Sequence, residues 1–240
     1  MKKIGKKDQP PLSVRLIRAK LADLMNQGDP ESPGSKIGDA VGIYAYFDFD
    51  GEPIYVGQTS SAFRDRVGRH MNGQRSDAVA KFILDPFEVA DVEMWSVSGV
   101  KGAVDPENDT KPLSVSQKRR MLEPFEYSVY SILERQSMFR AVLNEGVIKP
   151  SALVVPPVSV RGRIVPDELW EERKHSDVRI ARRASTISRL SQMISEREVS
   201  GGMRRTLLLQ AKRLAWLADD RIREIGAQLP DDEDRLIDED

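Results

Sequence analysis

The sequence predicts an α/β (α+β) fold in which helices flank a small three-stranded antiparallel sheet, with a helical hairpin at the C-terminus. Residues 41–47 alternate between two faces as a strand does, and the turn dipeptide Asp50-Gly51 separates them from a second strand. In the last third, apolar residues recur at helical spacing on both sides of Ser200-Gly201-Gly202. Two amphipathic helices with so short a link predict an antiparallel hairpin.

Length and composition limit the classes of protein to which the chain can belong. A length of 240 residues fits one elaborated domain or two small ones. Cysteine is absent, which excludes a disulfide framework and a thiolate zinc site. No apolar run approaches the roughly 20 residues of a membrane helix, and the first residues lack an apolar signal core, so we expect a cytoplasmic protein without a membrane partner.

The charge of the chain is uneven. The net charge is only −1, so any nucleic acid must be attracted by local basic patches. Acidic residues crowd into the tail, whereas basic residues concentrate elsewhere.

The spacing of apolar residues and the positions of turn residues predict where the strands and helices lie. The first strand places Tyr44 and Tyr46 on the face opposite Ile43 and Ala45. After the second strand, a serine-capped helix carries Arg66 and His70, and Phe87–Val97 alternates as a third strand. Further helices are expected after Ser13, over Ala78–Leu84, and over Phe125–Phe139.

These elements divide the chain into five parts. The expected parts are an N-terminal leader and helix (1–39), a domain with a surface insertion at 98–116 (40–147), a Pro-rich extended connector (148–175), the helical hairpin (176–228) and an acidic tail (229–240).

Four polar or aromatic side chains are expected to converge. Tyr44 and Tyr55 lie on neighbouring strands, and Arg66 and His70 lie one helical turn apart. Arg64 is a rival for Arg66, but residues two apart do not share a helix face, so only Arg66 points with His70.

The motifs come in a distinctive order. Gly42-Ile43-Tyr44 is followed ten residues later by Tyr55-Val56-Gly57, then by R-x-x-x-H, a glutamate on a later helix and an asparagine after it. This ordered set resembles the GIY-YIG nuclease family, over about Val41 to Asn144. The resemblance implies an endonuclease that hydrolyses DNA phosphodiester bonds with Mg²⁺ or Mn²⁺, acting in restriction or host defence.

The resemblance also implies roles for the individual residues. Arg66 would stabilise charge on the phosphate, because its planar fork matches phosphate oxygens. His70 would act as a base or tune a tyrosine, because its ordinary pKa lies near neutrality. One of Tyr44 and Tyr55 would help to activate the nucleophile, and the other would contact phosphate.

A single carboxylate is expected to hold the metal ion. Glu126 is preferred because an acid early in its helix fits the family pattern, but spacing leaves Glu134 and Glu123 open. Asn144 would hold the active-site backbone or a tyrosine by amide hydrogen bonds, or it simply caps the end of its helix.

Other basic and polar residues are candidates for nucleic-acid contact. Those singled out are Gln58, Lys118, Arg119 and Arg120. The basic helix after residue 175 would lie along DNA, or pack its regular apolar stripe on the rest of the chain or on a second copy in a homodimer. The alternative function is a non-catalytic nucleic-acid-binding or assembly protein that keeps the fold.

Overall fold

Four strands form the main antiparallel sheet. The computed structural model describes residues 9–71, 82–105, 108–144, 146 and 148–227. Within them, the strands follow the order β2-β1-β3-β6, with all neighbours antiparallel. Their bounds are β1 Gly42–Phe47, β2 Pro53–Thr59, β3 Asp91–Ser96 and β6 Ser159–Arg163. A separate two-stranded ribbon pairs β4 Val104–Asp105 with β5 Asn108–Pro112.

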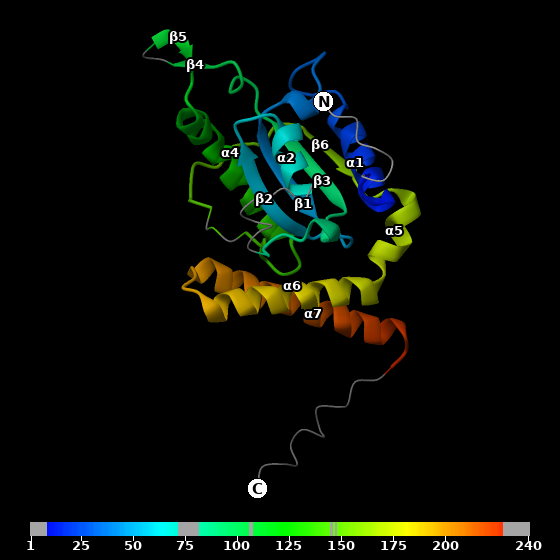
Figure 1. Ribbon diagram of the computed structural model, residues 1–240. Helices are drawn as coiled ribbons and strands as arrows, with labels where there is room; N and C mark the ends of the chain where they lie inside the picture. Colours follow the sequence, from blue (N-terminus) through cyan, green and yellow to red (C-terminus); the bar gives the residue numbers. More distant parts are fainter. Residues whose placement is uncertain (1–8, 72–81, 106–107, 145, 147, 228–240) are drawn as a thin grey trace.

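Helices cover both faces of the sheet (Figure 1). On one face, α1 (Leu12–Met25) and α2 (Phe63–Met71) pack on Tyr44, Tyr46 and Met94. On the other face, α4 (Val115–Gln136) packs on Ile43, Ala45 and Trp95. The mixed α/β class and the alternation of β1 are therefore confirmed, because each face of the pleated strand buries its own set of side chains.

The sheet has one strand more than the three that the sequence predicted. β6 comes from the expected extended connector, which also contains α5 (Asp167–Lys174). Its sequence, SVRGR, shows no apolar alternation. Instead, Arg161 pairs with Asp91 on β3, and Gly162 leaves room for Leu24, whose Cδ1 would lie 2.6 Å from an added Cβ. Pairing between distant segments, rather than local pattern, thus creates this strand.

The helix expected at Phe125–Phe139 begins ten residues earlier, at Val115. Ser114 caps it in a capping box with Gln117, so the last two residues of the expected surface insertion at 98–116 belong to α4. Pro124 lies inside the helix. Short 3₁₀ turns complete this part of the fold, at η2 (Ile37–Asp39) and η3 (Pro86–Glu88).

The C-terminal helices α6 (Ser176–Glu196) and α7 (Gly201–Glu224) form a paired hairpin that lies across one end of the sheet (Figure 1). The predicted apolar stripe of α6 is half-buried at Ile180, Ile187 and Ile194 and exposed at Ala184. The fully buried positions were not predicted; they are Arg179, Arg183, Thr186 and Leu190. On α7, the buried positions are Met203, Thr206, Gln210, Arg213 and Leu217.

The buried arginines have carboxylate partners at the sheet end. Arg183 lies 3.4 Å from both Asp48 and Glu88, and Arg179 donates to Asp50 at 2.9 Å. A buried guanidinium is tolerated only when it is paired and hydrogen-bonded, so the acidic turn between β1 and β2 selects the arginine face of α6.

Some of the predicted segments lie partly or wholly outside the residues that the structure describes. The basic leader, the acidic tail and most of the predicted helix Ala78–Leu84 lie outside the described residues, and the described end of that helix, 82–84, is not helical. None of the helices described here combines the length and the apolar character that a membrane crossing requires.

Candidate active site

Three tyrosines and a histidine gather on the α2 face of the sheet. Tyr46 pairs with Tyr55 across β1 and β2, and their rings stack with centroids 5.9 Å apart. Tyr44 lies 6.1 Å from Tyr55 by ring centroid and pairs in register with Gly57. An added Cβ at Gly57 would lie 2.8 Å from the ring of Tyr55 and 2.9 Å from the hydroxyl of Tyr44. Glycine is therefore required there because the two phenols occupy the space of a side chain.

Arg66 reaches this cluster from α2. Its Nε donates to the hydroxyl of Tyr44 at 3.2 Å, and its side chain is half-buried. Arg64 points elsewhere and pairs with Asp39 at 2.7 Å, with both side chains well exposed. The helical spacing argument that separated the two arginines thus agrees with their contacts.

His70 is enclosed by the three phenol rings. Its ring centroid lies 5.8 to 5.9 Å from those of Tyr44, Tyr46 and Tyr55, and the residue is 0% exposed. Neither ring nitrogen has a hydrogen-bond partner among the described residues. Burial lowers the pKa of His70 to about 4, and the positive charges of Arg66 and Arg69 add to this effect. His70 is therefore neutral at pH 7 and lies behind the tyrosines rather than at the surface.

The tyrosines are held in their neutral form. Burial raises the pKa of Tyr44 well above its usual value, and the nearby Tyr55 adds to the shift while Arg66 opposes it. Burial also raises the pKa of Tyr55 against the opposing charge of Arg66, and the carboxylate of Glu126 raises it further. At neutral pH the phenols are consequently hydrogen-bond donors and acceptors rather than phenolate bases.

Glu126 reaches the same region from α4, on the other side of edge strand β2. Gln58 on β2 donates its amide to Glu126 Oε2 at 2.9 Å. Burial raises the pKa of Glu126, and the hydrogen bond from Gln58 opposes this rise. The negative charge of Glu126 adds to the rise in the pKa of Tyr55.

The other two glutamates make different contacts. Glu134 accepts a hydrogen bond from Tyr130 of its own helix at 3.1 Å, and Glu123 is exposed. Of the three glutamates, Glu126 is therefore the one that a hydrogen bond joins to β2 among the described residues.

A hydrated hard cation fits Glu126. The Oε1 atom of Gln58 is buried and lacks a hydrogen-bond partner in the described part of the chain, so a second oxygen lies next to the carboxylate. Magnesium commonly binds through one or two carboxylates plus water and substrate phosphate. No cluster of three or more acidic or histidine ligands occurs among the described residues.

Asn144 holds the edge of β2. Its Oδ1 accepts from the backbone N–H of Val56 at 3.0 Å, and its Nδ2 donates to the carbonyl of Val56 at 2.6 Å. Leu143 adds a bond from its N–H to the carbonyl of Ile54 at 3.1 Å. Of the two roles expected for Asn144, the observed one is support of the backbone between Tyr55 and Gly57.

The expected nucleic-acid contacts lie on two elements. Lys118, Arg119 and Arg120 are in the first turns of α4, where the two arginines are exposed and the lysine is half-buried. Gln58 contacts Glu126. Tyr46 was missing from the expected site, although its position two residues after Tyr44 on one strand was the signal for it.

No family model, curated protein or solved structure matches the chain. The arrangement of the side chains is therefore the basis for any functional conclusion.

Proposed function

We propose that this protein is a divalent-metal-dependent endonuclease that hydrolyses DNA phosphodiester bonds. The observation that supports the proposal most strongly is the cluster of Tyr44, Tyr55 and Arg66, together with the hydrogen bond that joins Glu126 to Gln58 on the same edge strand as Tyr55. The order of these residues also resembles that of the GIY-YIG nuclease family, whose members act in processes that include restriction and host defence.

Each group has a task in phosphodiester hydrolysis. The guanidinium of Arg66 would contact a non-bridging oxygen and stabilise the charge that grows there. The hydroxyls of Tyr44 and Tyr55 would orient the phosphate and the attacking water by hydrogen bonds. Attack of water on phosphorus breaks one P–O ester bond and leaves a phosphate monoester and an alcohol. Because the phenols are neutral, they would act through hydrogen bonds rather than as bases, and His70, which lies behind them, would hold their rings in place.

Glu126 would hold the divalent ion, Mg²⁺ or Mn²⁺, and Gln58 would orient the carboxylate. When bound, such an ion supplies Lewis-acid stabilisation of the phosphate and lowers the pKa of water. Asn144 keeps β2, and with it Tyr55 and Gln58, in position through Val56.

A cleavage survey tests the proposal. The purified chain is incubated with supercoiled plasmid, linear duplex, single-stranded DNA and RNA, with Mg²⁺, Mn²⁺ or a chelator. We expect metal-dependent DNA cleavage that Arg66→Ala abolishes and Arg64→Ala retains, because Arg64 is exposed and pairs with Asp39. Full activity of Arg66→Ala would exclude the site assignment.

A non-catalytic nucleic-acid-binding protein is the second candidate. It is favoured by the complete burial of Tyr44 and His70, each 0% exposed, which also suits a purely structural cluster. Binding of DNA or RNA without cleavage, under every metal condition, would support this candidate. A homodimer through α6 and α7 stays a prediction. The buried arginines of α6 contact carboxylates of the same chain, so this face of the helix is already covered.

A further inference from the structure

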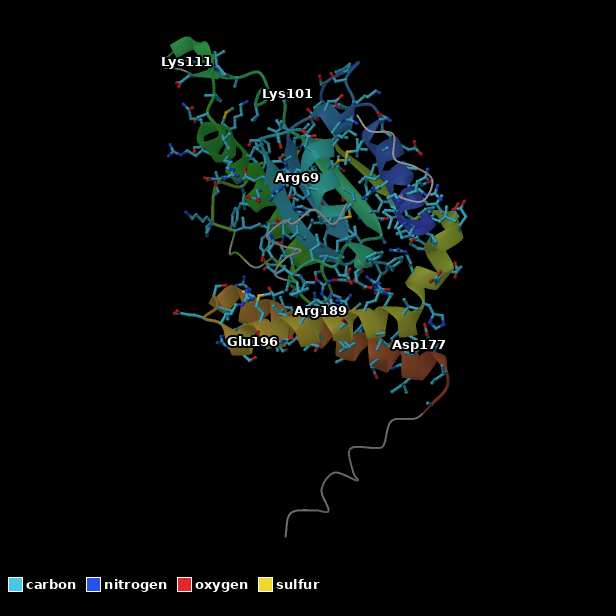
Figure 2. The ribbon with its side chains drawn as sticks, in the orientation of Figure 1. Arg69, Lys101, Lys111, Asp177, Arg189 and Glu196 are labelled. Carbon is cyan, nitrogen blue, oxygen red and sulfur yellow. The ribbon has the colours of Figure 1, made fainter. Side chains whose placement is uncertain are left out.

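A cavity lies between α6 and residues 82–87. Its volume is about 500 Å³, within the range of small-molecule pockets. Two phenyl rings and two guanidinium groups dominate its lining, those of Phe82, Phe87, Arg182 and Arg189. Figure 2 shows Arg189 on α6.

The two arginines of the cavity differ in whether they form an ion pair. Arg182 pairs with Asp85 at 3.0 Å, and Asp85 also accepts from the backbone of Phe87, so this carboxylate is already neutralised. Arg189 is exposed and forms no ion pair with any residue that the structure describes. Its guanidinium lies 5.6 Å from the centroid of the Phe82 ring. Among the described residues, the cavity therefore offers the guanidinium of Arg189 to an anion.

The two phenyl rings are unusually placed. Phe87 is 39% exposed, and the guanidinium of Arg182 lies 4.2 Å from its centroid. Phe82 has a backbone φ of +55°, in the left-handed region that bulky residues avoid. Strain of this kind persists where the surroundings hold it, and it concentrates at ligand sites.

We propose that this cavity binds one nucleotide, with the base stacked on the phenyl and guanidinium planes and the phosphate on Arg189. Unpaired bases stack on aromatic rings and on arginine planes, and arginine binds phosphate through parallel N–H donors. The same chemistry fits a free nucleoside monophosphate or an unpaired nucleotide of a DNA strand. The second source rests on the proposed function.

Binding is measured on the full chain carrying Glu126→Gln, without divalent ions, so that cleavage does not interfere. The probes are a fluorescein-labelled single-stranded oligonucleotide and the corresponding blunt duplex, read by fluorescence anisotropy, with dAMP as competitor. Phe82→Asn should weaken single-strand binding about tenfold, since stacking of one base contributes about 1–3 kcal/mol. Arg189→Ala should weaken it by about the same factor, since a hydrogen bond to a charged group contributes about 1.5–3 kcal/mol. Asparagine tolerates the left-handed backbone at position 82.

Arg204→Ala is the matched control, because Arg204 is an exposed arginine of the neighbouring helix α7 and does not line the cavity. Circular dichroism checks that every variant is folded. Displacement of the strand by dAMP assigns the free nucleotide as a ligand, and binding that dAMP does not displace assigns the strand. Unchanged affinity in both cavity variants, or an equal loss on the blunt duplex, would overturn the nucleotide site.

The two proposals fail separately. DNA cleavage by the unsubstituted chain, together with unchanged oligonucleotide binding in both Arg189→Ala and Phe82→Asn, removes the cavity proposal and leaves the nuclease. Cavity-dependent binding by a chain that cleaves nothing removes the nuclease and leaves the cavity site.

Discussion

The support that Asn144 gives to β2 leads to a quantitative prediction. Asn144 makes two hydrogen bonds to the backbone of Val56, whose side chain is 0% exposed, and Asn144 itself is 8% exposed. Asn144→Ala leaves the N–H and the C=O of Val56 without partners. Each buried unsatisfied group costs about 1–3 kcal/mol, so the two together should lower the free energy of unfolding by about 2–6 kcal/mol.

Asn144→Asp separates the two bonds. A carboxylate still accepts from the N–H of Val56 but repels its carbonyl, so this variant should lose about 1–3 kcal/mol at pH 7. The repulsion raises the folded-state pKa of the new acid above its unfolded value. Its deficit relative to the unsubstituted chain should therefore shrink as the pH falls and the acid becomes protonated.

The assay is urea unfolding followed by circular dichroism, for both variants and the unsubstituted chain at pH 7 and pH 5. Asn26→Ala serves as the control, because Asn26 is an exposed asparagine that contacts only a lysine side chain through its amide. A change below about 0.5 kcal/mol for Asn144→Ala would refute the reasoning, because that is the size of ordinary surface substitutions.

Three further predictions concern the cluster and its surroundings. The depressed pKa of His70 means that its contribution is present above pH 6.5 and is lost as the pH falls toward 4, by about 3 kcal/mol. His70→Phe should lack this loss in urea unfolding at pH 7 and pH 4, and an unchanged pH dependence would contradict it. Arg183→Met strands buried carboxylates and should cost about 3–5 kcal/mol by the same assay, while exposed Arg204→Met should cost almost nothing. Gly57→Ala should lose about 1–3 kcal/mol through overpacking and also slow cleavage, whereas Gly102→Ala, with no atom within 4 Å of its added Cβ, should do neither. Equal behaviour of the two glycine variants would contradict the close packing at Gly57.

Local patterns revealed the part of the site that lies on adjacent elements. Alternation along β1 placed Tyr44 and Tyr46 on one face, and the Asp50-Gly51 turn brought Tyr55 opposite them. The four-residue step from Arg66 to His70 then selected the helix face directed at these rings. Period and turn chemistry are properties of neighbouring residues, so one sequence is enough to read them.

Contacts between segments that are distant in the sequence could not be predicted from local patterns. β6 forms because β3 offers it a register and an acidic partner, and neither is visible in the segment itself. The buried arginine face of α6 was not predicted, because an apolar stripe and an arginine stripe run along the same helix. Only the carboxylates at the end of the sheet, such as Asp48, decide which stripe is buried. Likewise, the contact between Gln58 and Glu126 joins residues 68 positions apart.

The most direct test of the central claim is the rate of Mg²⁺-dependent plasmid cleavage by Glu126→Gln and Glu123→Gln, prepared identically. Both substitutions neutralise one carboxylate on α4. Only Glu126 accepts a hydrogen bond from Gln58, and its charge raises the pKa of Tyr55. We predict that Glu126→Gln abolishes cleavage at every Mg²⁺ concentration while Glu123→Gln cleaves at the unsubstituted rate. Equal cleavage by the two variants would contradict a metal-dependent site at Glu126.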